Sequence, residues 1–226
     1  MAALFSAPAL AQESCSPALY FLSRGDYNRA QVAAGRDDGT PAARLNIRGV
    51  AEMMEGRQRE ATATLRSALT ADPDYLPARL NLGIALYHQR RDEEAAIELE
   101  RVYAAESPLR ASAAYHRGLV AVRASEPATA LVWFGRSIES DPGLADAYLQ
   151  TGHVHEELGD FQLAGRAYRR YLEHHPESPT GLLRFGIAAQ RAGHIETARR
   201  YLRLVLDVAP ASIEAVEARK FIVMWD

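Results

Sequence analysis

Lysine and cysteine are almost absent from this chain: Lys220 is the only lysine and Cys15 the only cysteine among 226 residues. A single cysteine excludes a disulfide within the chain and a zinc site built from several cysteines. The formal net charge of −3 at pH 7 argues against nucleic acid as a partner, because a nucleic-acid-binding surface needs a basic stripe. No stretch approaches the ~20 apolar residues of a transmembrane helix. We therefore expect no nucleic-acid partner and no transmembrane segment.

Motifs for phosphate binding, acyl transfer or zinc proteolysis are also missing, since the glycines do not cluster and no nucleophile elbow occurs. The densest polar group is His153-Val154-His155-Glu156-Glu157. Its two histidines would point about 200° away from each other on a helix, so they cannot share one metal ion. A site made of His116, His153 and Glu156 is the minor alternative, a metal-binding or catalytic protein. We expect no enzyme activity, no metal and no cofactor.

Three residue types recur along the chain with a period of about 34 residues. They are glycine at Gly49, Gly83, Gly118, Gly152 and Gly186, alanine at Ala61, Ala95, Ala130, Ala164 and Ala198, and proline at Pro73, Pro108, Pro142, Pro176 and Pro210. A fixed period of this length is typical of stacked helical hairpins. Because such arrays present extended binding surfaces, the repeat favours a binding protein over an enzyme.

Each repeat contains two apolar segments at helical spacing, joined by a short polar turn. In the fourth repeat we expect helices over 145–158 and 161–174, with Gly159-Asp160 between them. The repeated glycine lets the first helix approach the second closely. Larger residues one turn after the alanine are expected to fill the space between the two helices: Leu65, Leu99, Phe134, Tyr168 and Leu202. The proline ends the second helix, because it cannot continue a helix and disfavours helical geometry in the residue before it.

This pattern resembles the tetratricopeptide repeat, in which alanine, an aromatic residue and proline stand at fixed offsets. The best copy consists of Tyr148, Gly152, Gly159, Ala164, Tyr168, Leu172 and Pro176. The resemblance implies an all-α fold, a right-handed superhelical solenoid of antiparallel helix pairs. Five repeats are expected at residues 42–75, 76–110, 111–144, 145–178 and 179–212. The chain is similar to small exported tetratricopeptide proteins of Gram-negative bacteria.

The two ends of the chain depart from the repeat. Residues 12–41 are predicted to form a degenerate helical hairpin, and residues 213–226 a C-terminal capping helix with Ser212 as its N-cap. That helix is apolar on more than one side, so either the last repeat absorbs it or it offers a surface for self-association. Residues 1–11 end in Ala9-Leu10-Ala11 and are interpreted as the remnant of a signal peptide, or as an apolar tail. We expect export to the periplasm, with a cytoplasmic location as the alternative.

In the family that the chain resembles, ligands lie along a concave face formed by the first helix of each repeat. The resemblance therefore implies a largely apolar groove for a protein or peptide partner. Its expected residues are Asn46, Val50, Met53, Leu80, Ile84, Tyr87, His88, Tyr115, Leu119, Val122, Arg123, Leu149, His153, Glu156, Glu157, Leu183, Ile187, Gln190 and Arg191. Burial between neighbouring helices is the alternative for Leu80, Leu149 and Leu183.

The leading hypothesis is a non-enzymatic scaffold that binds a protein or peptide partner in the assembly of an envelope complex. A cytoplasmic adaptor with the same fold is the first alternative, and the metal-binding or catalytic protein is the second.

Overall fold

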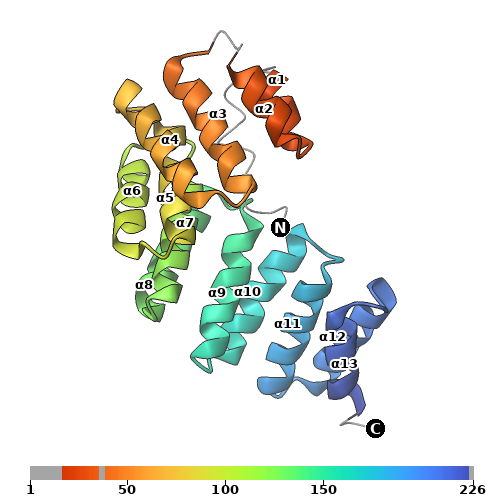
Figure 1. Cartoon of the computed structure of the whole chain (residues 1–226). Helices are drawn as coiled ribbons and strands as arrows, with labels where there is room; N and C mark the ends of the chain where they lie inside the picture. The colour runs from red at the N-terminus through yellow and green to blue at the C-terminus, as the bar shows by residue number, and fades with distance from the viewer. Residues whose placement is uncertain (1–16, 36–38, 224–226) are drawn as a thin grey trace. The chain divides into compact units, whose positions relative to one another are not determined.

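A computed structural model describes residues 17–35 and 39–223 of the chain (Figure 1). Within these residues the chain is helical and has no strands. The helices are α1 (Pro17–Ser23), α2 (Tyr27–Ala34), α3 (Pro41–Met54), α4 (Gln58–Ala71), α5 (Leu76–His88), α6 (Asp92–Ala104), α7 (Arg110–Arg123), α8 (Pro127–Ser140), α9 (Ala145–Glu157), α10 (Phe161–His174), α11 (Pro179–Arg191), α12 (Ile195–Val208) and α13 (Ile213–Val223). The predicted signal-peptide remnant at 1–11, Cys15 and the last residues, 224–226, lie outside the described residues.

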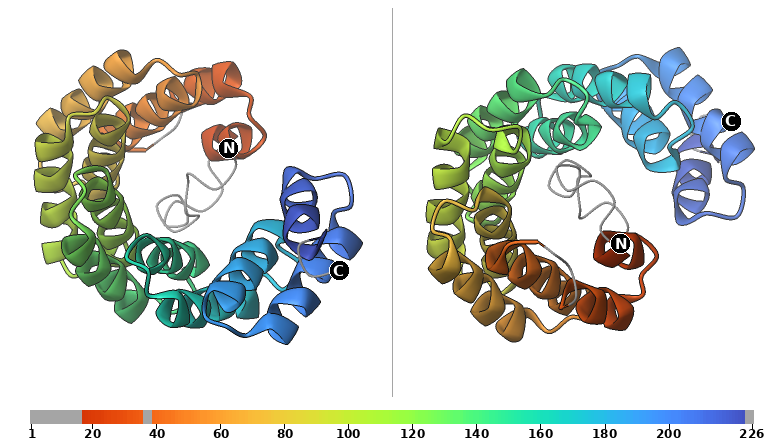
Figure 2. Two further views of the ribbon diagram at one scale, coloured as in Figure 1. Left: turned by 90° about the horizontal axis from the view of Figure 1, so that it is seen from below. Right: turned by 90° about the horizontal axis from the view of Figure 1, so that it is seen from above.

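The chain forms two compact units, one up to Ala124 and one from Ser125 onward. In the N-terminal unit, helices α1 to α7 pack in chain order, each against the next (Figure 2). In addition, α3 contacts α5 and α5 contacts α7. In the C-terminal unit, α8 to α13 pack in the same way, and α11 also contacts α13. These stacked helix pairs confirm the predicted all-α solenoid, and the boundary between the two units falls inside the third predicted repeat.

The turns between the two helices of a pair share one backbone conformation. A residue with positive φ occurs in each of them: Gly25, Gly56, Arg90, Ser125, Gly159 and Gly193. The amide after this residue often bonds back to the carbonyl five residues earlier, as between Asp160 and His155 at 2.8 Å. This bond is the mark of a Schellman motif, which satisfies the last carbonyls of a helix. Because Arg90 adopts a conformation that favours glycine, the packing of α5 against α6 must impose the turn there.

Several helices begin with a hydroxyl cap, some of them followed by proline. The side chain of Thr40 accepts a hydrogen bond from the amide of Ala43 before α3, and Ser178 caps α11 in the same way. Each is followed by proline at the first helical position, where the missing N–H costs nothing. Ser212 accepts a bond from the amide of Ala215, which confirms it as the predicted cap of the last helix.

The repeated glycine and the large residue of the second helix contact each other in every repeat for which this contact is described. A Cβ atom added to the glycine would lie 2.7 Å from Leu65 at Gly49, 2.8 Å from Leu99 at Gly83, 2.4 Å from Tyr168 at Gly152 and 2.8 Å from Leu202 at Gly186. These distances are too short for any real Cβ contact. The helices of these pairs therefore approach as closely as a missing side chain allows.

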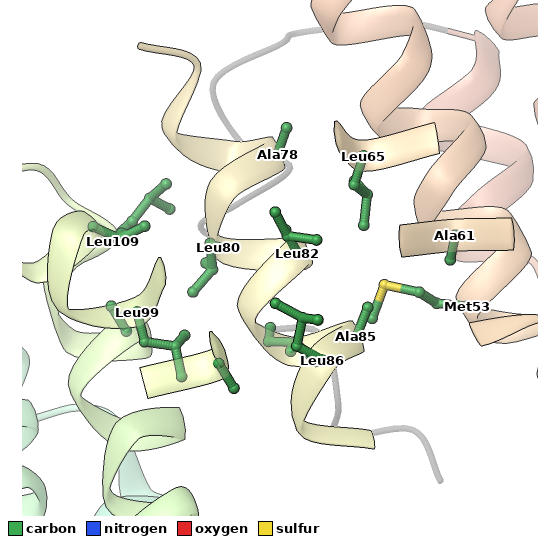
Figure 3. Close-up of a cluster of buried hydrophobic side chains, with 14 of the residues drawn as sticks. Met53, Ala61, Leu65, Ala78, Leu80, Leu82, Ala85, Leu86, Leu99 and Leu109 are labelled. Atoms are coloured by element: carbon green, nitrogen blue, oxygen red, sulfur yellow. The ribbon is translucent and has the colours of Figure 1, made fainter. Parts of the chain in front are cut away.

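The core of the N-terminal unit surrounds two of these contacts, those of Leu65 and Leu99. Leu65 and Leu99 are fully buried and pack in one cluster with Leu80, Leu82 and Leu86 (Figure 3). The repeated alanines at positions 61, 95, 130, 164 and 198 are also fully buried. Small residues on one side and leucines on the other thus fill the space between helices, as the sequence predicts.

We expect Gly152→Ala to destabilise the protein although alanine is the better helix former. Its methyl group would overlap the ring of Tyr168, at a cost of roughly 1–3 kcal/mol against a gain of about 1 kcal/mol in helix propensity. Gly135→Ala is the matched control, because Gly135 lies within α8 and an added Cβ would meet nothing within 4 Å. Urea unfolding followed by circular dichroism measures both variants. Stabilisation by Gly152→Ala would contradict the close approach.

Candidate protein-interaction site

The structure buries seven of the residues that were expected to form the open groove. They are Asn46, Val50, Met53, Leu80, Ile84, Leu183 and Ile187. In the N-terminal unit, Leu80 and Ile84 belong to the core cluster with Met53. The physical reason is that first helices also pack against the next first helix, as α3 does against α5, so these positions fill the space between them. For Leu80 and Leu183 the alternative of burial between helices therefore holds, whereas Leu149 remains partly exposed.

The other twelve expected residues retain exposed surface. Nine of them are partly exposed: Tyr87, Tyr115, Leu119, Val122, Arg123, Leu149, His153, Glu156 and Gln190. Three are exposed: His88, Glu157 and Arg191. Those of the N-terminal unit lie on α5 and α7 and those of the C-terminal unit on α9 and α11.

The α5–α7 surface of the N-terminal unit consists of Tyr87, His88, Tyr115, Leu119, Val122 and Arg123. Arg123 is the most firmly held side chain of this surface. Its guanidinium lies 3.7 Å from the centroid of the Tyr87 ring. The Nε atom of Arg123 donates to Oδ2 of Asp92 at 3.0 Å, and a second guanidinium nitrogen donates to Oδ1. A two-pronged bond to a carboxylate combined with stacking on an aromatic ring holds the guanidinium in one place.

His88 adds a neutral ring to this surface. Although the residue as a whole is exposed, the partial burial of its ring, and then the positive charge of Arg123, lower the pKa of His88 below its ordinary value. Its ring packs edge to face against that of Tyr87, with 5.4 Å between the centroids. The surface therefore combines aromatic and aliphatic side chains with a single ordered cation. Tyrosine and arginine of this kind are typical energetic centres of protein interfaces.

A buried polar contact joins two first helices of the N-terminal unit. The side-chain amide of Asn81 on α5 donates to Oδ1 of Asn46 on α3 at 2.8 Å, and both residues are buried. Asn46 was expected to contact a ligand, but its oxygen is occupied by this bond. A buried hydrogen bond of this kind fixes the register of the two helices.

A depression of about 800 Å³ lies at the turn side of the N-terminal unit. It is lined by Gly56, Arg57, Gln58, Arg59, Glu60, His88, Gln89 and Arg91. Arg57 is paired with Glu55, and Arg91 with Glu94 at 2.7 Å. Much of the positive charge that lines the depression is therefore already compensated. The depression extends the α5–α7 surface at His88 with polar side chains.

The C-terminal unit contains a polar cluster of His153, Glu156, Tyr168 and Arg184. The hydroxyl of Tyr168 on α10 donates to Oε2 of Glu156 on α9 at 2.6 Å, and Nη1 of Arg184 on α11 lies 3.5 Å from Oε1 of Glu156. The rings of His153 and Tyr168 pack edge to face at 5.6 Å. The cluster therefore connects three helices through one carboxylate.

The protonation states in this cluster follow from burial and from its partners. Burial, and then the hydrogen bond to Glu156, raise the pKa of Tyr168, which stays a neutral donor. Burial, and then the charge of Arg184, lower the pKa of His153, while Glu156 opposes this shift. The carboxylate that the minor alternative assigned to a metal is thus engaged by a phenol and a guanidinium.

Four of the residues that make these contacts were not among the expected ones: Asn81, Asp92, Tyr168 and Arg184. For Arg184 a signal existed, because its column in the repeat reads Ile47, Asn81, His116, Gln150 and Arg184 and is polar in four copies. Tyr168 was expected only as a filler of the space between helices. Asp92 lies on a second helix, and nothing in its sequence position indicates that it pairs with Arg123.

The described residues do not form a set of metal ligands. Among residues 17–35 and 39–223, no group of three or more histidine, cysteine, aspartate or glutamate side chains is placed to hold a metal ion. His153 and Glu156 share the cluster of the C-terminal unit, and His116 belongs to the N-terminal unit.

No helix in the part of the chain that the structure describes is long and apolar enough to cross a membrane.

Comparison with protein families identifies the fold class. Two models of the tetratricopeptide repeat match residues 52–117 and 115–180, which together cover more than half of the chain. The chain therefore belongs to the tetratricopeptide repeat family, whose members bind protein or peptide partners and are generally non-catalytic scaffolds. A search of curated proteins finds no match.

Solved structures with similar folds include PilF, PilW and YrrB. PilF of Pseudomonas aeruginosa is 23% identical with a TM-score of 0.77, over 90% of this chain and 93% of that one. PilW, a widely conserved type IV pilus biogenesis factor, is 19% identical with a TM-score of 0.78, over 87% and 92%. YrrB, a tetratricopeptide protein with an unusual peptide-binding site, is 20% identical with a TM-score of 0.62, over 86% and 97%. At this level of identity the likeness shows the fold.

Stability is expected to depend on pH through His116, which is buried on α7 and whose Nδ1 atom has no hydrogen-bond partner among residues 17–35 and 39–223. Burial, and then the nearby His88, lower the pKa of His116 from 6.5 to about 4. As the pH falls from about 6.5 to 4, the unfolded chain takes up a proton that the folded chain does not. Stability is therefore full above pH 6.5 and decreases by roughly 3 kcal/mol as the pH falls to 4.

The measurement is the free energy of unfolding from pH 7 to pH 4 for the wild type and for His116→Leu. The variant should lose about 3 kcal/mol less than the wild type over this range. Parallel curves for the two proteins would show that His116 is protonated as easily in the folded chain as in the unfolded one.

Proposed function

We propose that this protein is a non-enzymatic scaffold that binds a protein or peptide partner in the assembly of an envelope complex. The observation that carries the proposal is the α5–α7 surface, where aromatic and aliphatic side chains remain partly exposed around an arginine that is already held in place. A repeat array gains nothing for its own stability from leaving these side chains in water. Their exposure is best explained by a partner.

The chemistry of the surface favours a short apolar segment with an acidic or carbonyl group near Arg123. Leu119 and Val122 are aliphatic, and Tyr87 and Tyr115 offer flat faces with polar tips. Three buried anchors contribute roughly 1.5–3 kcal/mol each. After the cost of association and ordering, this corresponds to a dissociation constant in about the micromolar range. An extended peptide or one face of an amphipathic helix suits such a surface.

The envelope role rests on two supports. PilW is a type IV pilus biogenesis factor of similar fold, and the likeness extends over nearly the whole of both chains. The sequence Ala9-Leu10-Ala11 supports export. We propose that the protein acts in the periplasm, in the assembly of a pilus or a comparable complex. The cytoplasmic adaptor has the same fold and differs in the fate of residues 1–11, which the intact mass of the protein from its host reveals.

Self-association through the C-terminal helix, with the groove as one place where that helix could bind, is a further candidate mode of binding. The metal-binding alternative of His116, His153 and Glu156 predicts stoichiometric metal in purified protein, which elemental analysis measures.

The test is photocrosslinking in the host cell from position 119. A photoreactive residue at Leu119 should capture one discrete envelope protein, identified by mass spectrometry. The same residue at Ile97 is the control, because Ile97 is an exposed aliphatic residue on α6, a second helix of the same unit. Leu119→Glu should weaken binding of the captured protein by at least tenfold with little change in melting temperature, and Ile97→Glu should leave binding unchanged.

The outcomes separate the two parts of the proposal. Equal capture from both positions, or normal binding by Leu119→Glu, would disprove the role of the α5–α7 surface. Specific capture of a cytoplasmic protein would retain the scaffold and overturn its envelope role.

A further inference from the structure

The last helix, α13, has an exposed apolar face that no described part of the chain covers. Its inner side, with the fully buried Ala215 and Ala218, packs against the core of the C-terminal unit. On the opposite side, Ile213 is 84% exposed, Val216 is 52% exposed and Val223 is 73% exposed. Three exposed β-branched residues on one short helix are more than scattered surface apolar residues would give.

The exposed side of α13 also lines a hollow on the surface. Ile213, Val216, Glu217, Lys220 and Phe221 line a hollow of about 440 Å³. These positions follow the spacing i, i+3, i+4, i+7 and i+8, which places them along one stripe of the helix. We call this stripe the α13 face. Apolar side chains with two charges among them form the pattern of a helix that packs against another helix.

The two charges of the α13 face have no partner among the described residues. Glu217 and Lys220 are three residues apart and of opposite sign, yet no ion pair forms between them or with any other described residue. Elsewhere the same spacing does give ion pairs, as between Arg91 and Glu94 at 2.7 Å and between Arg170 and Glu173 at 2.9 Å. Lys220 is also the only lysine of the chain.

We infer that the α13 face binds the α13 face of a second copy of this chain, with the two helices antiparallel. Reversal of the helix direction places Glu217 of one copy opposite Lys220 of the other, and Lys220 opposite Glu217. The same register places Val216 opposite the side of Phe221 that does not pack on its own core, so one aliphatic and one aromatic side chain meet beside each charge pair. When two copies of α13 lie antiparallel, the charges of one face are opposite the complementary charges of the other. A surface that is complementary to itself in this way is the condition for a twofold symmetric dimer.

The contact between two helices of this length is smaller than a standard protein interface, so the dimer is expected to be weak. Its dissociation constant should lie in about the micromolar to millimolar range. The inference goes beyond the proposed function and shares no residue with the α5–α7 surface. Failure of either one leaves the other intact.

The first test is sedimentation equilibrium of the full chain over a wide concentration range. The wild type should show a reversible monomer–dimer equilibrium. Val216→Asp should abolish the dimer, and Val132→Asp should not, because Val132 is an equally exposed valine (53%) on α8 of the same unit. Circular dichroism checks that both variants remain folded. A wild type that stays monomeric at millimolar concentration overturns the inference.

The second test examines the antiparallel register by charge exchange. Glu217→Lys and Lys220→Glu alone each place like charges opposite each other twice per dimer, and each should weaken the dimer by about tenfold. The double variant Glu217→Lys/Lys220→Glu should recover the wild-type dissociation constant to within about threefold, since the pairs are restored in reverse. Weakening by both single variants without recovery in the double variant would overturn the antiparallel pairing.

Chemical crosslinking gives a direct readout because the chain has one lysine. A carbodiimide should join Lys220 of one copy to Glu217 of the other, in a mixture of isotopically light and heavy protein. Mass spectrometry should find light–heavy linked peptides. Links within single chains only would contradict the inference. If the wild type is monomeric but a chain without residues 224–226 dimerises, the chain's own end covers the face, and the inference is wrong.

Discussion

The contact between a glycine of one helix and a large side chain of the next fixes how close the two helices of a pair can come. It is described between Gly49 and Leu65, Gly83 and Leu99, Gly152 and Tyr168, and Gly186 and Leu202. At each of these positions a side chain on the glycine would overlap its neighbour. The buried alanines lie on the same second helices and leave room for this approach. The spacing between helices is therefore set by residues that have almost no side chain.

Close pairing has a consequence for the binding surface. When the two helices of a pair are this close, neighbouring first helices can also pack on one another, as α3 does on α5 and α11 on α13. Leu80, Ile84 and Ile187 then contribute to the cores of their units and are removed from the surface. What remains for a partner lies mainly toward the ends of α5 and α7, around Arg123. The same packing that stabilises the array thus leaves a smaller exposed area on the first helices than the repeat pattern implies.

In the fourth repeat, the large residue opposite the glycine both fills the space between the helices and orders polar side chains. In three of the four described contacts the large residue is leucine, but in the fourth repeat it is Tyr168. Its ring fills the space against Gly152, and its hydroxyl reaches Glu156, which also lies near Arg184. A core residue thereby orders two charged side chains at the edge of the core. The polar cluster of the C-terminal unit depends on a helix spacing that glycine provides.

Much of the fold could be predicted from the sequence because the signals are local and repeated. The helix expected at 161–174 is observed as Phe161–His174, and the one expected at 145–158 ends one residue earlier. Proline and glycine mark these ends by their backbone geometry, which needs no tertiary context. The site was less predictable, because offsets within a repeat identify a helix face but not what covers it. The pair of Asp92 and Arg123 spans 31 residues and two helices, and only the fold brings it together.

The central claim is that the repeated glycine and the large residue opposite it together determine the spacing between the two helices of a pair. A double-mutant cycle tests this claim most directly. Gly186→Ala, Leu202→Ala and the double variant would be compared with the wild type by urea unfolding. Alone, the first introduces an overlap and the second a cavity, whereas in the double variant the new methyl group occupies part of the space that Leu202 leaves. The double variant should therefore be more stable than the sum of the single effects predicts, by more than about 1 kcal/mol. Effects that add to within about 0.5 kcal/mol would contradict the claim.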